Sequence, residues 1–454
     1  MSNLKYDAVV IGSGIGGMCT GALLNHYGYK TLVVEKLQRM GGRSSTYDLE
    51  GFRVPTGAVA ISTGGLLQEV FKEVGAKWGA REVSKSYYRI DGKDYELPIQ
   101  GQTRALLSLI EQLEGNSIKI FSEIAKKVGP EKIMGAFGRG VKSERDLNKG
   151  GIMFSDWLAQ YTDNERVKAA FHSLTAAIFA VNSWELPAAA WFSYIAAHEA
   201  GLGRYSLHPR GTIGIIEELA EVVKRDGGDV WTNCPAKNII IKQGKAAGVV
   251  VEKDGTEMEI EAKAVVSNMG PKQTMNMAGR TNFPAEYVAE VDRKMRPAPI
   301  IAGLIASDVP LSEAATSIVV GARRMVSSVS GSLVCPEWAP KGQYLFVFWG
   351  QPPTSLEKCD HDAEIKECMK DLCEMYPIFE KHGRVLKWDY HDIDDDFPAF
   401  RTWAGWDVSQ MTPIPNLYNV GDGAKPLGWG GLPNGAKTAK IVVEDIKRKI
   451  KLKK

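Results

Sequence analysis

Three glycines at the spacing G-x-G-x-x-G stand between two short β-branched runs near the start of the chain, and this pattern constrains the fold more than any other feature. The segment VVIGSGIGGMCTGALLNHYGYKTLVVEK runs from Val9 to Lys36. Residues 7–11 and 31–34 have the composition of strands, and residues 15–27 have apolar positions at helical spacing. We therefore predict a strand–helix–strand unit with the glycines in its first turn.

The chemistry of this turn predicts a dinucleotide site. Gly12, Gly14 and Gly17 suit a tight turn, close approach of the backbone to a pyrophosphate and close packing of helix on strand. The start of the helix offers N–H groups and the positive end of its dipole to phosphates. Glu35 ends the second strand, close to the spacing of about 20 residues typical of a carboxylate that binds a ribose hydroxyl. The unit indicates a Rossmann-like α/β domain but does not separate NAD from FAD.

A second glycine pair points to FAD. Gly41 and Gly42 directly precede Arg43, and Arg39 lies just before them. These residues resemble the paired-glycine motif of the flavoprotein family that contains phytoene desaturases, amine oxidases and related dehydrogenases. The resemblance implies that this loop passes over the FAD pyrophosphate and flavin. A planar, permanently charged guanidinium suits a phosphate.

The C-terminal segment NLYNVGDGAKPLGWGGLPNGAKTAKIVVEDI, residues 416–446, is similar to the flavin motif of the same family. Gly421 and Asp422 match its Gly-Asp pair, and the resemblance implies that Asp422 accepts a hydrogen bond from a ribityl hydroxyl. Pro433 favours a helix start nearby. The N-terminus of that helix would face the flavin and stabilise negative charge on the reduced ring.

The middle of the chain carries a fourth match. Residues 211–268 are predicted to form a helix and then strands separated by Gly-Lys and Asp-Gly turns, and they resemble the adenine-side segment of the family. Ala236 stands where the family usually has a valine whose backbone pairs with the adenine edge. Residues 265–268 resemble the strand that returns under the FAD.

The resemblance thus implies FAD, bound without a covalent link because residues 421–435 contain no cysteine. It assigns FAD contacts to Gly12, Ser13, Gly14, Ile15, Gly16, Gly17, Glu35, Lys36, Arg39, Gly41, Gly42, Arg43, Ala236, Gly421 and Asp422. The sequence assigns no catalytic residue. Trp429, inside the C-terminal motif, is the candidate for a wall over the isoalloxazine ring.

These motifs imply a discontinuous α/β architecture: a Rossmann-like FAD-binding domain plus a substrate domain of mixed sheet and helical cap. The FAD-binding domain takes residues 1–75, 205–275 and 410–454. The substrate domain takes residues 76–204, which form the helical cap, and residues 276–409, which form the sheet. Within these insertions, residues 104–129 and 154–201 are predicted to be mainly helical, and PIIAGLIAS and QYLFVFWG are predicted strands.

The resemblance implies an oxidoreductase that dehydrogenates or desaturates a small apolar, isoprenoid- or carotenoid-like substrate by hydride transfer to flavin N5. Residues 171–201 are alanine-rich and aromatic, and they could line a pocket or form the core of the cap. A flavin amine oxidase is the alternative, although the lysine such enzymes place beside the flavin is not located here. The family also contains saturases and isomerases. A non-catalytic prenyl-binding chaperone, related to the Rab GDP-dissociation inhibitor, is disfavoured by the intact Gly42–Arg43 and Gly421–Asp422 pairs.

Composition narrows the partners. The chain has 56 basic and 54 acidic residues, which gives no basic field for nucleic acid. Six scattered cysteines without a C-x-x-C pair, and an acidic run beside His391 typical of a solvated face, indicate no metal. No secretory leader pattern precedes the first strand, so a cytoplasmic protein is expected. The basic tail Lys447–Lys454 suits a helix C-terminus or a weak contact with a membrane surface. The electron acceptor (oxygen, a quinone or a nicotinamide nucleotide) stays open.

Overall fold

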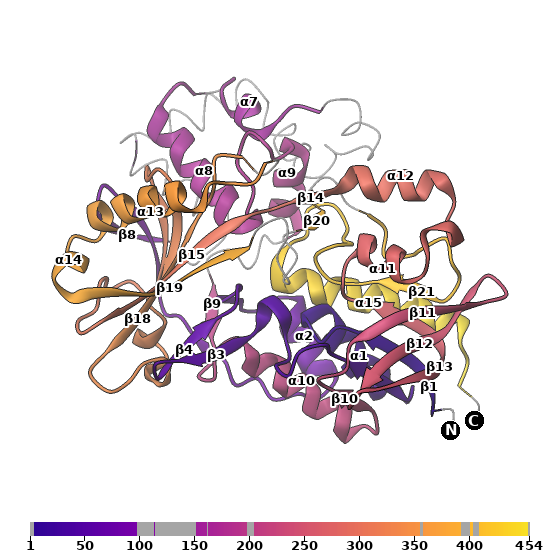
Figure 1. Cartoon of the computed structure of the whole chain (residues 1–454). Coiled ribbons are helices and arrows are strands. Elements are labelled where there is room, and N and C mark those ends of the chain that lie inside the picture. The colour runs from indigo at the N-terminus through magenta and orange to yellow at the C-terminus, as the bar shows by residue number, and fades with distance from the viewer. Residues whose placement is uncertain are drawn as a thin grey trace.

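Two sheets, each with its own helices, dominate the molecule, and a helical cap lies above them (Figure 1). The computed structural model describes residues 4–97, 113, 151–160, 162–197, 204–354, 357–391, 400–402 and 408–452. Among these residues, no helix is long and apolar enough to cross a membrane.

The first sheet contains both ends of the chain and its middle. Its strand order is β10-β2-β1-β13-β12-β11, with β21 also paired to β13. Strands β10, β2, β1, β13 and β21 run parallel, whereas β11 and β12 add an antiparallel hairpin to the first half of β13. The strands are β1 (Leu4–Ile11), β2 (Thr31–Val34), β10 (Asp229–Trp231), β11 (Ala236–Lys242), β12 (Lys245–Lys253), β13 (Thr256–Ser267) and β21 (Leu417–Asn419).

Helices cover both faces of this sheet, which explains why the second half of β1, residues 8–11, is apolar and buried throughout. Ala8 and Val10 face a core shared with one helical layer, and Val9 and Ile11 face the opposite core. The first layer comprises α1 (Ile15–His26), α2 (Leu66–Glu73), α10 (Ile213–Arg225) and α15 (Gly431–Lys449). The second layer comprises α11 (Pro271–Met277) and α12 (Ala285–Lys294).

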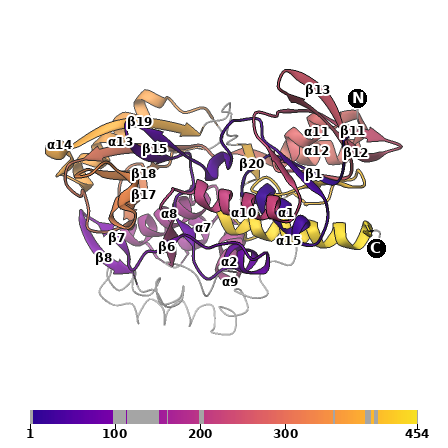
Figure 2. The same cartoon turned by 90° about the horizontal axis from the view of Figure 1, so that it is seen from below.

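The second sheet has the order β19-β15-β18-β17-β16-β7-β8 and is antiparallel except between β16 and β7. Its outer face is covered by α13 (His361–Met375) and α14 (Phe379–His382) (Figures 1 and 2). Its strands are β7 (Ser86–Ile90), β8 (Lys93–Leu97), β15 (Ile300–Ser307), β16 (Thr316–Val320), β17 (Met325–Val329), β18 (Tyr344–Gly350) and β19 (Gly383–His391).

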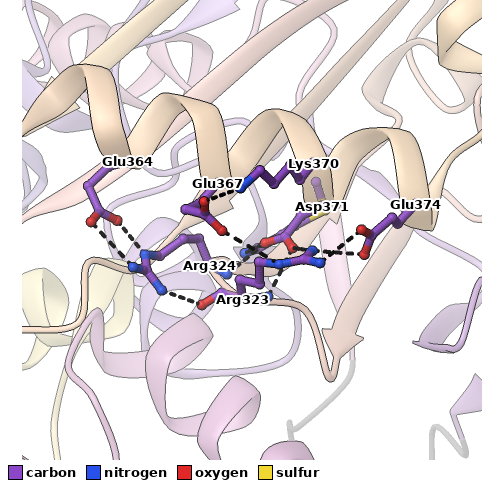
Figure 3. A network of polar contacts seen from close by, with 8 residues as sticks. Arg323, Arg324, Glu364, Glu367, Lys370, Asp371 and Glu374 are labelled. Carbon is purple, nitrogen blue, oxygen red and sulfur yellow. Dashed lines mark hydrogen bonds and ion pairs between the residues drawn. The ribbon is translucent and has the colours of Figure 1, made fainter.

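An ion-pair network fixes α13 to this sheet (Figure 3). The fully buried Asp371 accepts hydrogen bonds from the backbone N–H groups of Arg323, Arg324 and Met325 at 2.6–3.0 Å. The Arg324 guanidinium also pairs with Glu364. An open groove of about 840 Å³ is lined by Arg324 and by residues of α13. Helix α13 itself lies far from α1 and α15 (Figure 1). Because its contacts fall on residues 323–325, the network orders the turn between β16 and β17.

The cap is built on aromatic packing. Phe154, Phe171 and Trp191 form a buried cluster with ring centres 5.1–6.2 Å apart. The cap helices are α7 (Phe154–Leu158), α8 (Glu165–Phe179) and α9 (Ala188–Ala197). The remaining elements are β3 (Thr46–Leu49), β4 (Phe52–Pro55), β5 (Ile61–Ser62), β6 (Arg81–Glu82), β9 (Tyr205–Leu207), β14 (Met295–Pro297), β20 (Phe400–Thr402) and the 3₁₀ turns η1 (Gly42–Ser44), η2 (Arg280–Asn282), η3 (Gly331–Leu333) and η4 (Pro336–Trp338).

The predicted elements occur with small shifts. Strand 31–34 and the first helix are confirmed, and the two predicted buried strands are β15 and β18. Within the predicted helical stretch 154–201, the described residues form three helices separated by turns, and residues 161 and 198–201 lie outside the described part. The C-terminal helix begins at Gly431, two residues before Pro433, so proline lies inside its first turn, where no intrahelical N–H is needed. The predicted helix 104–129 lies outside the described residues, apart from residue 113.

Candidate functional site

The parallel strands of the first sheet end at one edge, and the sequence motifs follow them there. Ile11 pairs with Val34 and with Ser267, and Ser267 pairs with Asn419. Parallel strands in this register end together, so the loops after β1, β2, β13 and β21 begin side by side. Ligands of open α/β sheets bind outside the carboxyl ends of the strands. This edge is therefore the candidate site.

The first glycine loop has the geometry that a phosphate site requires. Gly12 has φ +93°, which favours glycine. A Cβ at Gly17 would overlap the carbonyl oxygen of Gly12, so α1 lies directly against the loop. Gly14 precedes the helix, and no side chain caps this end of α1. The backbone N–H groups of the first helical turn are thus available to an anion.

Glu35 is held against this loop. Its Oε2 accepts hydrogen bonds from the backbone N–H of Ser13 at 3.0 Å and from Ser13 Oγ at 2.6 Å, and its Oε1 accepts from the N–H of Leu37 at 3.0 Å. A carboxylate offers about four acceptor positions. The remaining position on Oε1 suits a ribose hydroxyl, so the predicted role of Glu35 is compatible with its second function of ordering the loop.

The second glycine pair joins the same site through Ser13. The N–H of Gly41 donates to Ser13 Oγ at 3.0 Å. Gly41 and Gly42 both have positive φ, +101° and +54°. A Cβ at Gly42 would meet no atom within 4 Å, so the backbone of this turn borders open space. The turn is therefore shaped for close approach by a ligand.

Arg43 meets the C-terminal motif. Its Nη2 lies 3.4 Å from Asp422 Oδ2, although about 380 residues separate the two in sequence. Lys425 Nζ lies 3.8 Å from the other oxygen of Asp422, and its side chain is only 3% exposed. One carboxylate thus stands between two cations. The permanently charged guanidinium of Arg43 suits an anionic cofactor.

Helix α15 fixes the Gly-Asp turn. The N–H of Gly421 donates to Thr438 Oγ1 at 2.9 Å, and Asn434 Nδ2 donates to the carbonyl oxygen of Gly421 at 3.0 Å. A Cβ at Gly435 would lie 2.6 Å from Ile15 Cγ2. The N-terminal ends of α1 and α15 are therefore in contact, and both dipoles favour negative charge at the site.

Asn268 joins the glycine segments, and sequence reasoning did not assign it a role. A Cβ at Gly14 would overlap Asn268 Nδ2, and a Cβ at Gly421 would overlap Asn268 Oδ1. A Cβ at Gly16 would lie 2.7 Å from the same Oδ1. The backbone N–H of Asn268 donates to the carbonyl oxygen of Ile11 at 2.8 Å. A polar residue directly after a buried β-branched strand was the signal that could have identified it.

The adenine-side segment runs beside Glu35. The N–H of Glu35 donates to the carbonyl oxygen of Trp231, and the N–H of Cys234 donates to the carbonyl oxygen of Glu35, both at 2.8 Å. Ala236 follows and begins β11, while Lys36 is exposed. The adenine contact of Ala236 stays a prediction, but its segment is next to the ribose-binding candidate.

Buried polar atoms at this edge fit FAD. Arg39 Nε, Ser45 Oγ and Asn434 Oδ1 are buried and have no hydrogen-bond partner among the described residues. Buried polar groups are normally satisfied. The phosphate and carbonyl oxygens of FAD would accept hydrogen bonds from Arg39 Nε and Ser45 Oγ. Its hydroxyl groups would donate to Asn434 Oδ1. Together with the open turn at Gly42, these atoms show that the residues present suit FAD.

Trp429 lies where the C-terminal motif meets the cap. Its ring is half-buried, and Lys437 Nζ is 5.2 Å from the ring centre. A Cβ at the neighbouring Gly428 would lie 2.5 Å from the backbone carbon of Ser193 in α9. The turn that carries Trp429 therefore rests on the cap. That Trp429 forms a wall over the flavin stays a prediction.

The acidic run after His391 lies outside the described residues, whereas His391 itself is buried at the end of β19. Within the described part of the chain, no group of three or more His, Cys, Asp or Glu side chains is placed to hold a metal ion.

Fold and site define a dinucleotide-binding flavoprotein, and comparison with known proteins identifies its family. Residues 15–447 match the family of flavin containing amine oxidoreductases, and the chain belongs to this family. It is therefore an FAD-dependent oxidoreductase by class, with FAD as its cofactor.

Individual relatives are distant. A 4,4'-diapophytoene desaturase (4,4'-diapolycopene-forming) from Methylomonas sp is 25% identical over 64% of this chain and 58% of its own length. A phytoene desaturase from Fusarium fujikuroi is 25% identical over 61% of this chain and 51% of its own length. The chain thus spans just over half the length of these curated relatives.

Solved structures show the same fold over the whole chain. An oxidoreductase from Methanosarcina mazei has a TM-score of 0.79 at 24% identity and covers 97% of this chain and 100% of its own. Cyclohexylamine oxidase from Brevibacterium oxydans has a TM-score of 0.65 at 15% identity and covers 98% of this chain and 100% of its own.

Proposed function

We propose that the protein dehydrogenates or desaturates a largely apolar, isoprenoid- or carotenoid-like molecule in an FAD-dependent reaction. The observation that carries this proposal is the contact between the C-terminal flavin motif and the apolar, aromatic core of the cap. Leu427 packs against the cap cluster, and the turn at Gly428 touches α9. A substrate held between the motif and the cap would meet mainly apolar surface.

The residues of the site have separable roles in this reaction. Bound FAD supplies the redox chemistry by accepting a hydride from carbon. The loop at Gly14, with Arg43, binds the anionic part of the cofactor. Asp422 and the N-terminus of α15 orient the flavin end, where the positive end of the helix dipole stabilises the charge of the reduced state. The cap excludes water from the reacting carbon.

The desaturases named among the relatives support the apolar substrate class, at 25% identity. A flavin amine oxidase is the second candidate, favoured by the likeness to cyclohexylamine oxidase across the chain. The described glycine cradle disfavours a chaperone that works without a cofactor, because such a protein needs no open turn at Gly42.

Anaerobic reduction of the bound flavin tests the proposal. Purified protein is mixed without oxygen with isoprenoid hydrocarbons, isoprenoid alcohols, primary amines and nicotinamide nucleotides, and the loss of flavin absorbance is followed. The proposal expects bleaching by an isoprenoid compound. Bleaching by an amine alone, rising with pH as the ammonium loses its proton, would overturn it in favour of an amine oxidase.

A further inference from the structure

Asn434 is a fully buried polar residue with one atom that the described part of the chain leaves unsatisfied. It is the fourth residue of α15, and it is 0% exposed. Asn434 Nδ2 donates to the carbonyl oxygen of Gly421 at 3.0 Å. Asn434 Oδ1 is buried and accepts no hydrogen bond from any residue that the structure describes. A buried acceptor without a donor costs stability, so this atom calls for a ligand that supplies one.

The orientation of this amide is fixed by its neighbours. A carbonyl oxygen can only accept, so the amide nitrogen of Asn434 must face Gly421 and the amide oxygen must face away. The carbonyl oxygen of Gly421 also accepts from the N–H of Ala424 at 3.2 Å. The hydroxyl of Thr438 donates to the backbone carbonyl oxygens of Asn434 and Gly435, so its proton is already engaged. Turning the amide over would bring two oxygens together and would still leave an acceptor unsatisfied.

The place of Asn434 at the sheet edge indicates which part of FAD lies beside it. Glu35 follows β2, the loop of Gly14 follows β1, and Gly421 follows β21. These strands lie in the order β2-β1-β13-β21, so Glu35 and Gly421 are three strand spacings apart, about 14 Å. The predicted ligand groups follow the same order: the adenine ribose at Glu35, the pyrophosphate at Gly14 and the ribityl chain at Gly421.

The ribityl chain also has the chemistry that Asn434 requires. The oxygens of a pyrophosphate are acceptors, and their negative charge is repelled by an amide oxygen. The ribityl chain carries hydroxyl groups, each of which can donate. Gly435, the next residue, packs on Ile15 and Gly16 at the start of α1, so Asn434 stands between the pyrophosphate loop and the Gly421 turn. The ribityl chain has to cross this interval to join the pyrophosphate to the flavin ring.

We propose that Asn434 is a positioning residue for the cofactor: its Oδ1 accepts a hydrogen bond from a ribityl hydroxyl of FAD, while its Nδ2 holds the Gly421 turn. Asp422, directly after that glycine, is the other acceptor predicted for the ribityl chain. The chain is then held from α15 as well as from the turn, and this fixes the position of the ring. The inference concerns the cofactor and does not depend on the proposed substrate.

Cofactor exchange on the FAD-loaded, full-length protein tests this contact. The protein is dialysed to equilibrium against mixtures of FAD and one analogue (2′-deoxy-, 3′-deoxy- or 4′-deoxy-FAD), and the bound cofactors are then released and quantified. The measured quantity is the preference for FAD over each analogue, which does not change when a variant weakens both equally. The test variant is Asn434→Ala. The control is Thr438→Val, because the N–H of Gly421 donates to Thr438 Oγ1 at 2.9 Å. The control therefore disturbs the same turn and keeps the Oδ1 acceptor.

The wild-type protein should prefer FAD over at least one deoxy analogue by about 2- to 12-fold, the effect of one neutral hydrogen bond. For one analogue, this preference should disappear in Asn434→Ala and persist in Thr438→Val. The contact is overturned if the wild-type protein shows no preference, if every preference survives in Asn434→Ala, or if Thr438→Val abolishes it equally.

Two further measurements separate this contact from its alternatives. Asn434→Leu keeps the branched shape of the side chain, so it takes the place of Asn434→Ala if the smaller residue prevents folding, and the same loss of preference is expected. N3-methyl-FAD probes the N–H of the flavin ring. If Asn434→Ala abolishes discrimination against N3-methyl-FAD and leaves the preferences against the deoxy analogues unchanged, the donor is the ring and the ribityl assignment is wrong.

Discussion

Replacing Gly14 by alanine should damage the dinucleotide site through one identifiable contact. The added methyl group would lie within 2.5 Å of Asn268 Nδ2, and the next protein atom outside that residue, the carbonyl oxygen of Gly41, is 3.9 Å away. Gly14 has φ −60° and ψ 170°, so alanine brings no backbone strain. Asn268 cannot simply turn away, because its Oδ1 lies against Gly16 and Gly421. Overpacking of this kind costs about 1–3 kcal/mol.

Asn268→Ala should rescue this cost, because it removes the overlapping amide. We expect a coupling of about 1–3 kcal/mol between Gly14→Ala and Asn268→Ala in the free energy of unfolding of the FAD-free protein, measured with urea. The matched control is Gly16→Ala. Its methyl group would lie 2.8 Å from the backbone nitrogen of Gly421, a contact that removal of the Asn268 side chain leaves in place.

The FAD affinity of the same variants distinguishes a loss of protein stability from damage to the cofactor site. The Gly14→Ala/Asn268→Ala variant should regain stability but still bind FAD weakly, because the methyl group stands where the backbone approaches the pyrophosphate. A coupling near zero, or equal rescue of Gly16→Ala, would refute the role assigned to Asn268. Full recovery of FAD affinity would place the pyrophosphate elsewhere.

Four further results are expected. Glu35→Ala should lose about 1.5–3 kcal/mol of FAD binding, or one to two powers of ten in affinity by equilibrium dialysis, and unchanged affinity would mean that the ribose is held elsewhere. Trp429→Ala should keep FAD but slow its anaerobic reduction by substrate; a normal rate would exclude the wall. Lys447, Arg448 and Lys449 are paired with Glu444 and Asp445, so we expect no co-sedimentation with anionic vesicles, and salt-reversible binding would instead support the membrane contact. Burial lowers the pKa of His172 to about 4. Between pH 6.5 and 4 the unfolded chain therefore binds more protons at this residue than the folded protein does, so the free energy of unfolding should fall as the pH falls. The fall should be smaller in His172→Gln, and an equal dependence of the unfolding free energy on pH in the two proteins would contradict this.

The local motifs determined the first domain because each depends on short-range chemistry. A β-branched run, a glycine turn and a helix within 30 residues predict a βαβ unit regardless of distant contacts. The same holds for the strand at 31–34, which the structure places where the pattern did. Buried strands such as β15 and β18 were also predictable, because continuous apolar runs bounded by polar residues leave few alternatives.

The tertiary structure alone decided which distant residues meet. No local pattern shows that Asn268 stands against Gly14, Gly16 and Gly421, because that contact depends on the register of three parallel strands. The pairing of Arg43 with Asp422 likewise arises when segments 379 residues apart in the sequence fold together. The glycine turn of the sequence thus predicted a dinucleotide cofactor by itself, since a phosphate-binding turn is a local backbone geometry. The surroundings of the C-terminal motif were left to the tertiary structure, since they depend on how the turn at Leu427 and Gly428 packs against the cap.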